Sequence, residues 1–226
     1  VYAACAGFPL QILLGSNLIE SKNAKNIITL ASSHNLTAER QFRYPTEYGC
    51  PKKGTATCTL TACVSMLLTN EKTNIKVSGG LIGKVVNLGI NDVNNMGAVM
   101  APACADTIYT YLQNAHETVK DYDLILTGDL GKVGLNILQE YYEKVYNERL
   151  NKIMDAGDEI FLETSQYSGG SGPVCLPLVF LTKILKNKKY KKILIVGSGS
   201  LHNPTLVNQG KEIPAISHLV KIEVLS

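Results

Sequence analysis

Short apolar runs alternate along the chain with longer segments in which apolar residues recur every three or four positions. The short runs consist mainly of Ile, Leu and Val, as expected for strands buried on both faces of a sheet. They cover residues 27–31, 124–127 and 193–197. The helical segments cover residues 10–19, 101–112, 135–145 and 176–185. This alternation predicts βαβ units and therefore an α/β protein with a mostly parallel sheet.

Two stretches of the chain resemble each other. Residues 25–37 and 191–205 both begin with a lysine and a strand-like run, and both end in a Ser-containing loop with a His-Asn pair and a Thr. Each stretch follows a helical segment with a Pro-Leu pair, Pro9-Leu10 in the first case and Pro177-Leu178 in the second. Two such units predict a duplicated fold with pseudo-two-fold symmetry.

Length, charge and hydropathy exclude several classes of protein. The 226 residues suffice for one large α/β domain or two small ones, and the net charge of +3 is too small to indicate nucleic acid. No apolar run approaches the ~20 residues of a membrane span. The chain opens with Val1-Tyr2 and no basic segment, which predicts no signal peptide. It begins within a strand-like run and without methionine, so we expect that N-terminal residues are missing.

The six cysteines are scattered and form no Cys-x-x-Cys pair. This spacing argues against zinc and against a disulfide framework, so we expect reduced thiols in a cytosolic compartment, with no metal site and no cofactor. Lysines cluster between residues 183 and 192. Such a cluster is typical of a solvated helix end, and docking to an anionic membrane surface is the alternative.

Cys5 lies in a turn of small residues directly before a predicted helix. The helix dipole and the free backbone N–H groups of a helix N-terminus favour the thiolate form of a cysteine. A lone cysteine among apolar residues can equally be part of the core. Cys5 is therefore a candidate site residue, with a structural role as the alternative.

The connection after the first strand is unusually rich in groups that bind anions. It carries His34, Asn35, Arg40 and Arg43 within ten positions. Arginine suits carboxylates because it pairs with them through two parallel hydrogen bonds. A structural network, in which nearby glutamates neutralise the arginines, is the alternative.

A second candidate anion site is the run Gly169-Gly170-Ser171-Gly172. Its backbone N–H groups could point toward an anion at the mouth of the helix that follows. The spacing is not that of a phosphate-binding P-loop, and a tight turn alone would also explain it.

The segment from Ser32 to Gly49, together with residues 84–103, closely resembles the stage V sporulation protein AD family. That family has a thiolase-like fold and is associated with uptake of dipicolinic acid into the developing spore. The resemblance implies duplicated βαβ halves, of which residues 1–74 are the rear of an incomplete first half and residues 75–226 the complete second half. It also implies a strand near Ile160.

The resemblance places Cys5 where thiolases and ketoacyl synthases carry their acyl-accepting nucleophile. Those enzymes also use His or Asn from loops of the second half. The corresponding loops here, residues 127–134 and 167–173, contain neither. We therefore expect a protein without catalytic activity, and an acyltransferase that uses Cys5 is the alternative.

The ligand implied by the resemblance is dipicolinic acid, alone or with calcium. Its expected contacts are Cys5, His34, Asn35, Arg40, Arg43, Gly169, Gly170, Ser171 and Gly172. A homodimer, partners among the other stage V sporulation membrane proteins, and a peripheral position at the forespore inner membrane are implied as well. His202 is the repeat equivalent of His34, and either faces the same pocket or caps a turn. Asp129 has no assigned role.

Overall fold

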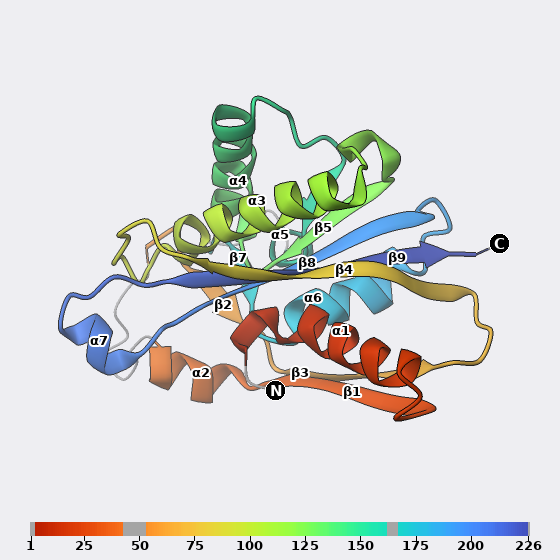
Figure 1. Cartoon of the computed structure of the whole chain (residues 1–226). Helices are drawn as coiled ribbons and strands as arrows, with labels where there is room; N and C mark the ends of the chain where they lie inside the picture. The colour runs from red at the N-terminus through yellow and green to blue at the C-terminus, as the bar shows by residue number, and fades with distance from the viewer. Residues whose placement is uncertain (1–2, 43–52, 162–166, 226) are drawn as a thin grey trace.

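The computed structural model describes residues 3–42, 53–161 and 167–225, with side chains of residues 40–42 excepted. Its centre is a five-stranded sheet (Figure 1). The strand order is β4 (Ile75–Val86), β9 (Ala215–Val224), β8 (Lys192–Ser200), β5 (Leu124–Gly128) and β6 (Ile153–Asp155). The sheet is mixed, because β8, β5 and β6 run parallel while β9 is antiparallel to both of its neighbours.

Helices cover both faces of this sheet (Figure 1). On one face lie α3 (Met96–Ala115) and α4 (Gly131–Tyr146), and on the other lie α1 (Gly7–Glu20), α6 (Cys175–Val179) and the π-helical turn Phe180–Ile184. The position of strand β8 in the sheet explains why its sequence is so apolar. Leu194 and Val196 belong to the core under α3 and α4, whereas Ile193 and Ile195 belong to the core around α1 and α6. Alternate residues of a strand point to opposite faces, so both faces of β8 are buried.

A further layer lies beyond α1. Strands β1 (Asn26–Ser33) and β3 (Ala62–Thr69) pair antiparallel, and α1 packs between them and the large sheet. Gly15 of α1 makes this approach possible, since a Cβ there would lie 2.6 Å from Leu68 Cδ1. On β1 and β3, the side chains of Ile28, Leu30 and Leu67 are exposed.

The remaining elements are short, and all but one surround one end of the sheet. At that end lie the 3-10 turn Ala4–Ala6, α2 (Asn35–Phe42), β2 (Thr57–Thr59), α5 (Ala156–Ile160), β7 (Gly169–Ser171) and α7 (Pro204–Asn208). The 3-10 turn Val119–Asp121 lies at the opposite end, directly before β5. Strands β2 and β7 pair in parallel although they are distant in sequence, with Thr57 opposite Gly169.

The predicted duplication is visible in the topology. A helical segment precedes β1 and another precedes β8, and a short helix follows each strand. Each strand then pairs antiparallel with a later strand, β1 with β3 and β8 with β9. The predicted domain boundary, between residues 74 and 75, falls at the start of β4.

One predicted element is wrong. Ile160 ends helix α5, and the strand of this region is β6, which ends at Asp155. The Asp155 carboxylate accepts hydrogen bonds from the backbone N–H groups of Gly157 and Asp158. A side-chain acceptor at this position caps a helix N-terminus, so the chain turns into α5 directly after β6.

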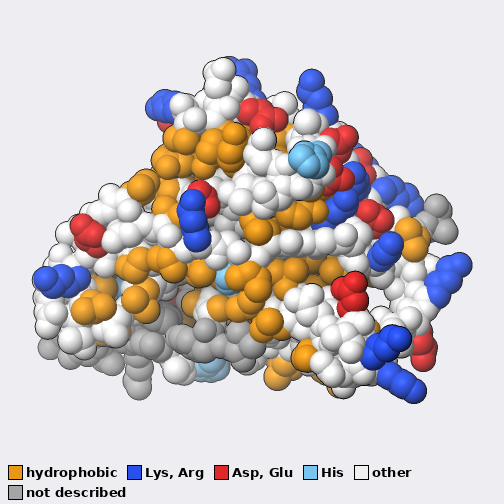
Figure 2. Space-filling model, in the orientation of Figure 1, with side chains coloured by type: hydrophobic (Ala, Val, Ile, Leu, Met, Phe, Trp, Pro, Cys, Tyr) orange, Lys and Arg blue, Asp and Glu red, His pale blue; other side chains and the backbone are white. Residues whose placement is uncertain are grey.

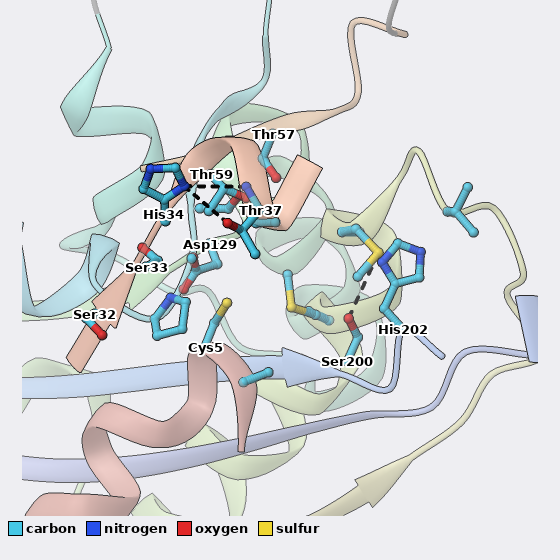
Figure 3. Close-up of a pocket in the computed structure, with 18 residues that line it drawn as sticks. Cys5, Ser32, Ser33, His34, Thr37, Thr57, Thr59, Asp129, Ser200 and His202 are labelled. Carbon is cyan, nitrogen blue, oxygen red and sulfur yellow. Dashed lines mark hydrogen bonds between the residues drawn. The ribbon is translucent and has the colours of Figure 1, made fainter. Parts of the chain in front are cut away.

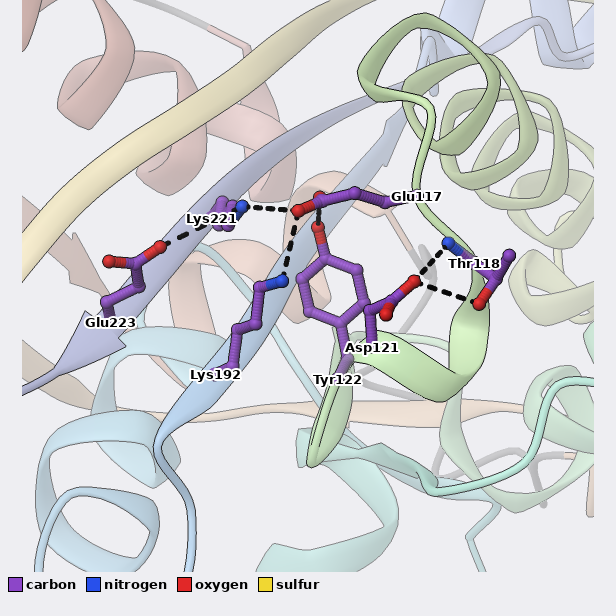
Figure 4. A network of polar contacts seen from close by, with 7 residues as sticks. All are labelled: Glu117, Thr118, Asp121, Tyr122, Lys192, Lys221 and Glu223. Carbon is purple, nitrogen blue, oxygen red and sulfur yellow. Dashed lines mark hydrogen bonds and ion pairs between the residues drawn. The ribbon is translucent and has the colours of Figure 1, made fainter.

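A charged cluster ties the end of α3 to the central sheet (Figure 4). Glu117 accepts hydrogen bonds from Lys192 on β8, at 3.0 Å, and from Lys221 on β9, at 2.8 Å. The hydroxyl of Tyr122 also donates to Glu117. Burial alone would raise the pKa of Glu117, but the hydrogen bonds from Lys221, Tyr122 and Lys192 outweigh it and lower this pKa to about 2.

The surface combines charged ends with an apolar band. In the view of Figure 2, hydrophobic side chains form a band across the middle of the molecule, while many charged side chains lie above it and to its right. Ile82 and Val85 on the edge strand β4 are more than half exposed, at 52% and 63%. Among the described residues, no helix combines the length and apolar character needed to cross a membrane.

Candidate functional site

A pocket of about 510 Å³ lies where the two repeated units meet (Figure 3). Its walls come from the loops after β1, β5, β7 and β8 and from the turn that carries Cys5. The polar side chains that line it are those of Cys5, Ser32, Ser33, His34, Thr37, Thr57, Thr59, Asp129, Ser171, Ser200 and His202. Val93, Met96, Met100 and Pro173 add apolar surface. A site at the ends of parallel strands agrees with the general rule for α/β proteins.

The turn that carries Cys5 is pressed closely against β8. Cys5 lies in the 3-10 turn Ala4–Ala6 that leads into α1, and Ala4 before it has a positive φ of 45°. A Cβ at Gly197 would lie 2.7 Å from Pro9 Cδ, and one at Gly199 would lie 2.8 Å from the carbonyl oxygen of Ala3. The two glycines of β8 thus allow the turn to lie on the strand and to present the Cys5 thiol to the pocket.

Asp129 is buried at the wall of the pocket, beside Cys5. It follows β5 directly, has a positive φ of 72° and is 0% exposed. Neither of its carboxyl oxygens makes a hydrogen bond of ordinary geometry to any described residue. Burial, followed by the negative charge of Asp155, raises the pKa of Asp129 well above its usual value, while the nearby Cys5 thiol and Gly172 N–H only partly offset this.

Burial disfavours the thiolate form of Cys5. Burial raises the pKa of Cys5 well above its usual value, the charge of Asp129 raises it further, and the backbone N–H of Gly172 only partly offsets this. This direction is opposite to the one expected from the helix N-terminus. Desolvation of the charged form outweighs the helix dipole at this position.

His34 and His202 both line the pocket, as equivalent residues of the two repeats. His34 precedes α2, and its Nδ1 accepts a hydrogen bond from the backbone N–H of Thr37, at 3.5 Å, and lies 3.2 Å from the hydroxyl of Thr37. His202 precedes α7, but Asn203 caps that helix by accepting from the N–H groups of residues 205 and 206. Of the two alternatives for His202, the structure shows the one that faces the pocket.

Asn35 has a structural role in the described part of the chain and does not line the pocket. Its side-chain amide donates to the carbonyl oxygen of Thr59, at 2.7 Å, and its backbone N–H donates to the hydroxyl of Thr61, at 2.8 Å. These contacts hold the start of α2 against β2. The side chain of Arg40 and the whole of Arg43 lie outside the described residues.

The glycine run also differs from its prediction. Gly169, Gly170 and Ser171 form strand β7, and only Ser171 and Gly172 line the pocket. A Cβ at Gly169 would lie 2.6 Å from the carbonyl oxygen of Gly157, so this glycine is needed for packing against α5. Residues 169–171 pair with β2, whereas the backbone N–H of Gly172 lies near Cys5 and Asp129.

Several pocket residues had no clear signal in the sequence. Thr57 and Thr59 reach the site only because β2 pairs with β7. Met96 and Met100 lie on the first turns of α3, and both line the pocket. Asp129 could have been found from its position after a buried strand, where parallel sheets place ligands. No group of three His, Cys, Asp or Glu side chains in the described ranges could hold a metal ion.

The comparisons with known proteins identify the family. The family model described as stage V sporulation protein AD (SpoVAD) matches residues 1–223. The chain belongs to this family. Stage V sporulation protein AD of Bacillus subtilis (strain 168) is 38% identical over 227 residues, which cover 99% of this chain and 67% of that protein. The protein is thus a sporulation protein of the SpoVAD family.

Solved structures confirm the predicted thiolase-like fold. The chain is similar to 3-oxoacyl-[acyl-carrier-protein] synthase III from Aquifex aeolicus VF5, with a TM-score of 0.59, 14% identity and coverage of 99% of this chain and 66% of that one. The tetronic acid condensing enzyme AbyA1 gives a TM-score of 0.61 at 11% identity, covering 99% and 67%. Cerulenin-bound OleA of Xanthomonas campestris gives 0.62 at 14%, covering 99% and 64%. The SpoVAD-family chain thus spans about two thirds of the length of each.

Proposed function

We propose that this SpoVAD-family protein binds dipicolinic acid in the pocket without transforming it, and so supports dipicolinate uptake into the developing spore. The observation that carries the proposal is the pocket itself, which places two histidines, several hydroxyl groups and an apolar wall around one cavity. Its volume of about 510 Å³ is typical of sites for small molecules. Imidazole N–H and hydroxyl groups can donate to carboxylates, and Met96 and Met100 offer a surface for a flat ring.

The surroundings of Cys5 support binding rather than catalysis. Acyl transfer needs a thiolate, and burial raises the pKa of Cys5. The loop after β5 presents Asp129 at a place where the resemblance called for a histidine or asparagine. A buried carboxyl group beside a thiol opposes its ionisation unless the carboxyl group itself takes the proton.

Calorimetric titration of dipicolinate, with and without calcium, tests this function. We expect saturable binding by the protein and binding weakened about tenfold by Cys5→Phe, which would fill the pocket beside Asp129. Cys63→Ser, on the exposed surface of β3, is the matched control and should bind like the wild type. A flat titration with protein shown to be folded by circular dichroism would overturn the proposal.

An acyltransferase that uses Cys5 is the second candidate. The position of Cys5 in the pocket favours it, as does the fold shared with condensing enzymes. Incubation with acyl-CoA followed by intact-mass spectrometry decides between the two functions. An acyl adduct that Cys5→Ala abolishes would support the enzyme, whereas an unmodified mass beside clear dipicolinate binding would support the binding protein.

We also propose that the protein is a homodimer. The exposed side chains of Ile28, Leu30 and Leu67 on β1 and β3 support this, because isolated proteins rarely leave such neighbouring apolar side chains in water. Light scattering coupled to gel filtration measures the mass. A monomer at all concentrations, or a dimer unaffected by Leu30→Lys with Leu67→Lys, would contradict this interface.

Peripheral attachment to the forespore inner membrane, beside other stage V sporulation proteins, is a further proposal. Lys186, Lys188, Lys189 and Lys191 are exposed around the turn before β8. Clustered lysines are attracted to anionic lipid headgroups. Sedimentation with vesicles should show binding to phosphatidylserine and little to phosphatidylcholine. Equal binding by a variant in which these four lysines are glutamine would overturn this role for the cluster.

A further inference from the structure

Two buried carboxyl groups near the pocket have opposite surroundings. Asp155 at the end of β6 accepts hydrogen bonds from one hydroxyl and four backbone N–H groups. These come from Thr127, Leu130, Gly131, Gly157 and Asp158. Asp129, on the neighbouring strand end, accepts no hydrogen bond of ordinary geometry in the described parts of the chain. Only one of the two groups therefore has the donors that a buried negative charge requires.

This difference decides which carboxyl group keeps a proton. Two carboxylates that share a buried site do not both ionise readily, and the one with more donors takes the charge. Burial raises the pKa of Asp155 as well, but its donors favour its charged form. We therefore expect Asp155 to carry the negative charge and Asp129 to keep the proton. Burial, together with the charge of Asp155, raises the pKa of Asp129 in the same direction.

The backbone keeps Asp129 in place at the pocket. Its φ of 72° lies in the left-handed region, which asparagine and aspartate tolerate better than most residues. Asp155 holds the following residues by accepting from the N–H groups of Leu130, at 3.2 Å, and Gly131, at 2.8 Å. Asp155 thus acts as a positioning residue for Asp129.

We propose that Asp129 binds a carboxylate of the ligand as a neutral acid, donating the hydrogen bond itself, so that the pocket takes up its dicarboxylate together with a bound proton. This inference rests on the proposed function, since it assumes a carboxylate ligand. A neutral acid offers one O–H donor that a carboxylate does not have. Hydrogen bonds to a charged partner are among the strong ones, and a buried donor makes recognition of an anion specific.

Other groups that face Asp129 do not replace it in this role. Cys5, Cys104 and Cys175 surround it from the turn before α1, from α3 and from α6, and each is a weak donor. Asp155 faces it from β6 as the charged carboxylate of the pair and offers no donor. His34 and His202 lie at the pocket as well, and their protonation also favours an anion. An experiment must therefore separate Asp129 from the histidines.

Asparagine and glycine provide the matched pair of substitutions. Both tolerate a positive φ, so neither should strain the turn. Asp129→Asn keeps a hydrogen-bond donor that has no proton to lose, whereas Asp129→Gly removes the donor. Both leave His34 and His202 unchanged, so any pH dependence due to the histidines is common to all three proteins.

The probe is dipicolinate, titrated calorimetrically into the whole chain over a series of pH values from near neutral to alkaline, in buffers of differing ionisation enthalpy. We expect Asp129→Asn to bind within a few-fold of the wild type, and Asp129→Gly to bind about tenfold or more weakly. As the pH rises through the pKa of Asp129, the wild type should lose affinity and take up one more proton per ligand than Asp129→Asn. Infrared spectroscopy at neutral pH should show a protonated-carboxyl band that Asp129→Asn lacks.

Each result that contradicts the inference about Asp129 has its own meaning. Equally weak binding by both variants would mean that the ligand needs the aspartate itself, and wild-type affinity in Asp129→Gly would mean that it makes no contact. Absence of the protonated-carboxyl band would also overturn the inference. No binding by the folded wild type at any pH would overturn the proposed function first, and this inference with it.

Discussion

His34 and His202 line one pocket from equivalent positions of the two repeated units. Each follows a strand, β1 or β8, and precedes a short helix. Across the cavity, the two rings lie on opposite sides of Cys5 (Figure 3). The duplication has therefore placed a similar imidazole on each side of the candidate site, and these two side chains are a direct way to test it.

Replacement of either histidine by alanine should weaken dipicolinate binding. A hydrogen bond to a charged group contributes about 1.5–3 kcal/mol, so each substitution should raise the dissociation constant roughly tenfold or more. Titration calorimetry measures the change. His116→Asn is the control, because His116 caps the far end of α3 with a φ of 53° that asparagine tolerates. Unchanged affinity in both His34→Ala and His202→Ala would remove the histidines from the site.

Cys5 should react slowly with alkylating reagents at neutral pH. Its pKa is raised by burial, so we expect little thiolate at neutral pH. The same thiol in protein unfolded by urea serves as the reference. Iodoacetamide labelling followed by peptide mass spectrometry should show that Cys5 is modified far more slowly in the folded protein, and this difference should close only as the pH becomes strongly alkaline. Faster labelling of Cys5 at neutral pH would indicate an activated thiol and favour the enzyme.

The Glu117 cluster should make folding stability depend on acid pH. The folded-state pKa of Glu117, about 2, is lower than its usual value of 4.5. Its stabilising contribution is therefore fully present above about pH 4.5 and is lost as the pH falls toward 2. At neutral pH, Glu117→Gln should lower the free energy of unfolding by about 1–2 kcal/mol, after allowance for solvent screening.

Urea unfolding at several pH values measures this difference between Glu117→Gln and the wild type. It should shrink as the pH approaches the folded-state pKa. The control is Glu143→Gln, which removes an exposed ion pair with Arg149 and should change stability by less than about 1 kcal/mol. A difference that stays constant down to the most acid pH would show that the charge of Glu117 does not carry the effect.

Helices α3 and α4 should not tolerate a methyl group where they cross. A Cβ at Gly97 would lie 2.6 Å from the Cα of Gly134 and 2.8 Å from the carbonyl oxygen of Leu130. Both are backbone atoms, so the helices would have to separate. We expect Gly97→Ala to destabilise the protein by about 1–3 kcal/mol, whereas Gly54→Ala, with open space around it, should be nearly neutral. Thermal unfolding of the two variants compares them, and equal melting temperatures would disprove the tight crossing.

The sequence identified the elements whose pattern is local. Strands β5 and β8 are covered on both faces, so their apolar runs are unbroken, and the helices on either side have clear periodicity. Strand β9 was not predicted, because polar residues such as Ser217 and His218 interrupt its apolar pattern. Their burial depends on hydrogen bonds to other elements, including Ser217 Oγ to the carbonyl oxygen of Gly197 on β8, at 3.0 Å.

The candidate site could be predicted from the sequence only in part, because some of its residues depend on contacts with distant parts of the chain. Cys5 and His34 stand next to recognisable strands or helices, so their positions could be argued from neighbouring residues. The burial of Asp129 and the structural role of Asn35 depend on partners far along the chain, including Thr59. Such contacts leave no periodic signal in a single sequence.

The pairing of β2 with β7 also has a consequence for how the protein folds. Thr57 and Gly169 are brought together from distant parts of the chain, so loop-closure entropy opposes their meeting until both repeated units have formed. We therefore expect the pocket, which Thr57 and Ser171 help to line, to be completed late in folding. A ligand that binds only the completed pocket would leave the folding rate nearly unchanged and would slow unfolding. The ligand-bound protein would therefore stay folded for longer than the free protein.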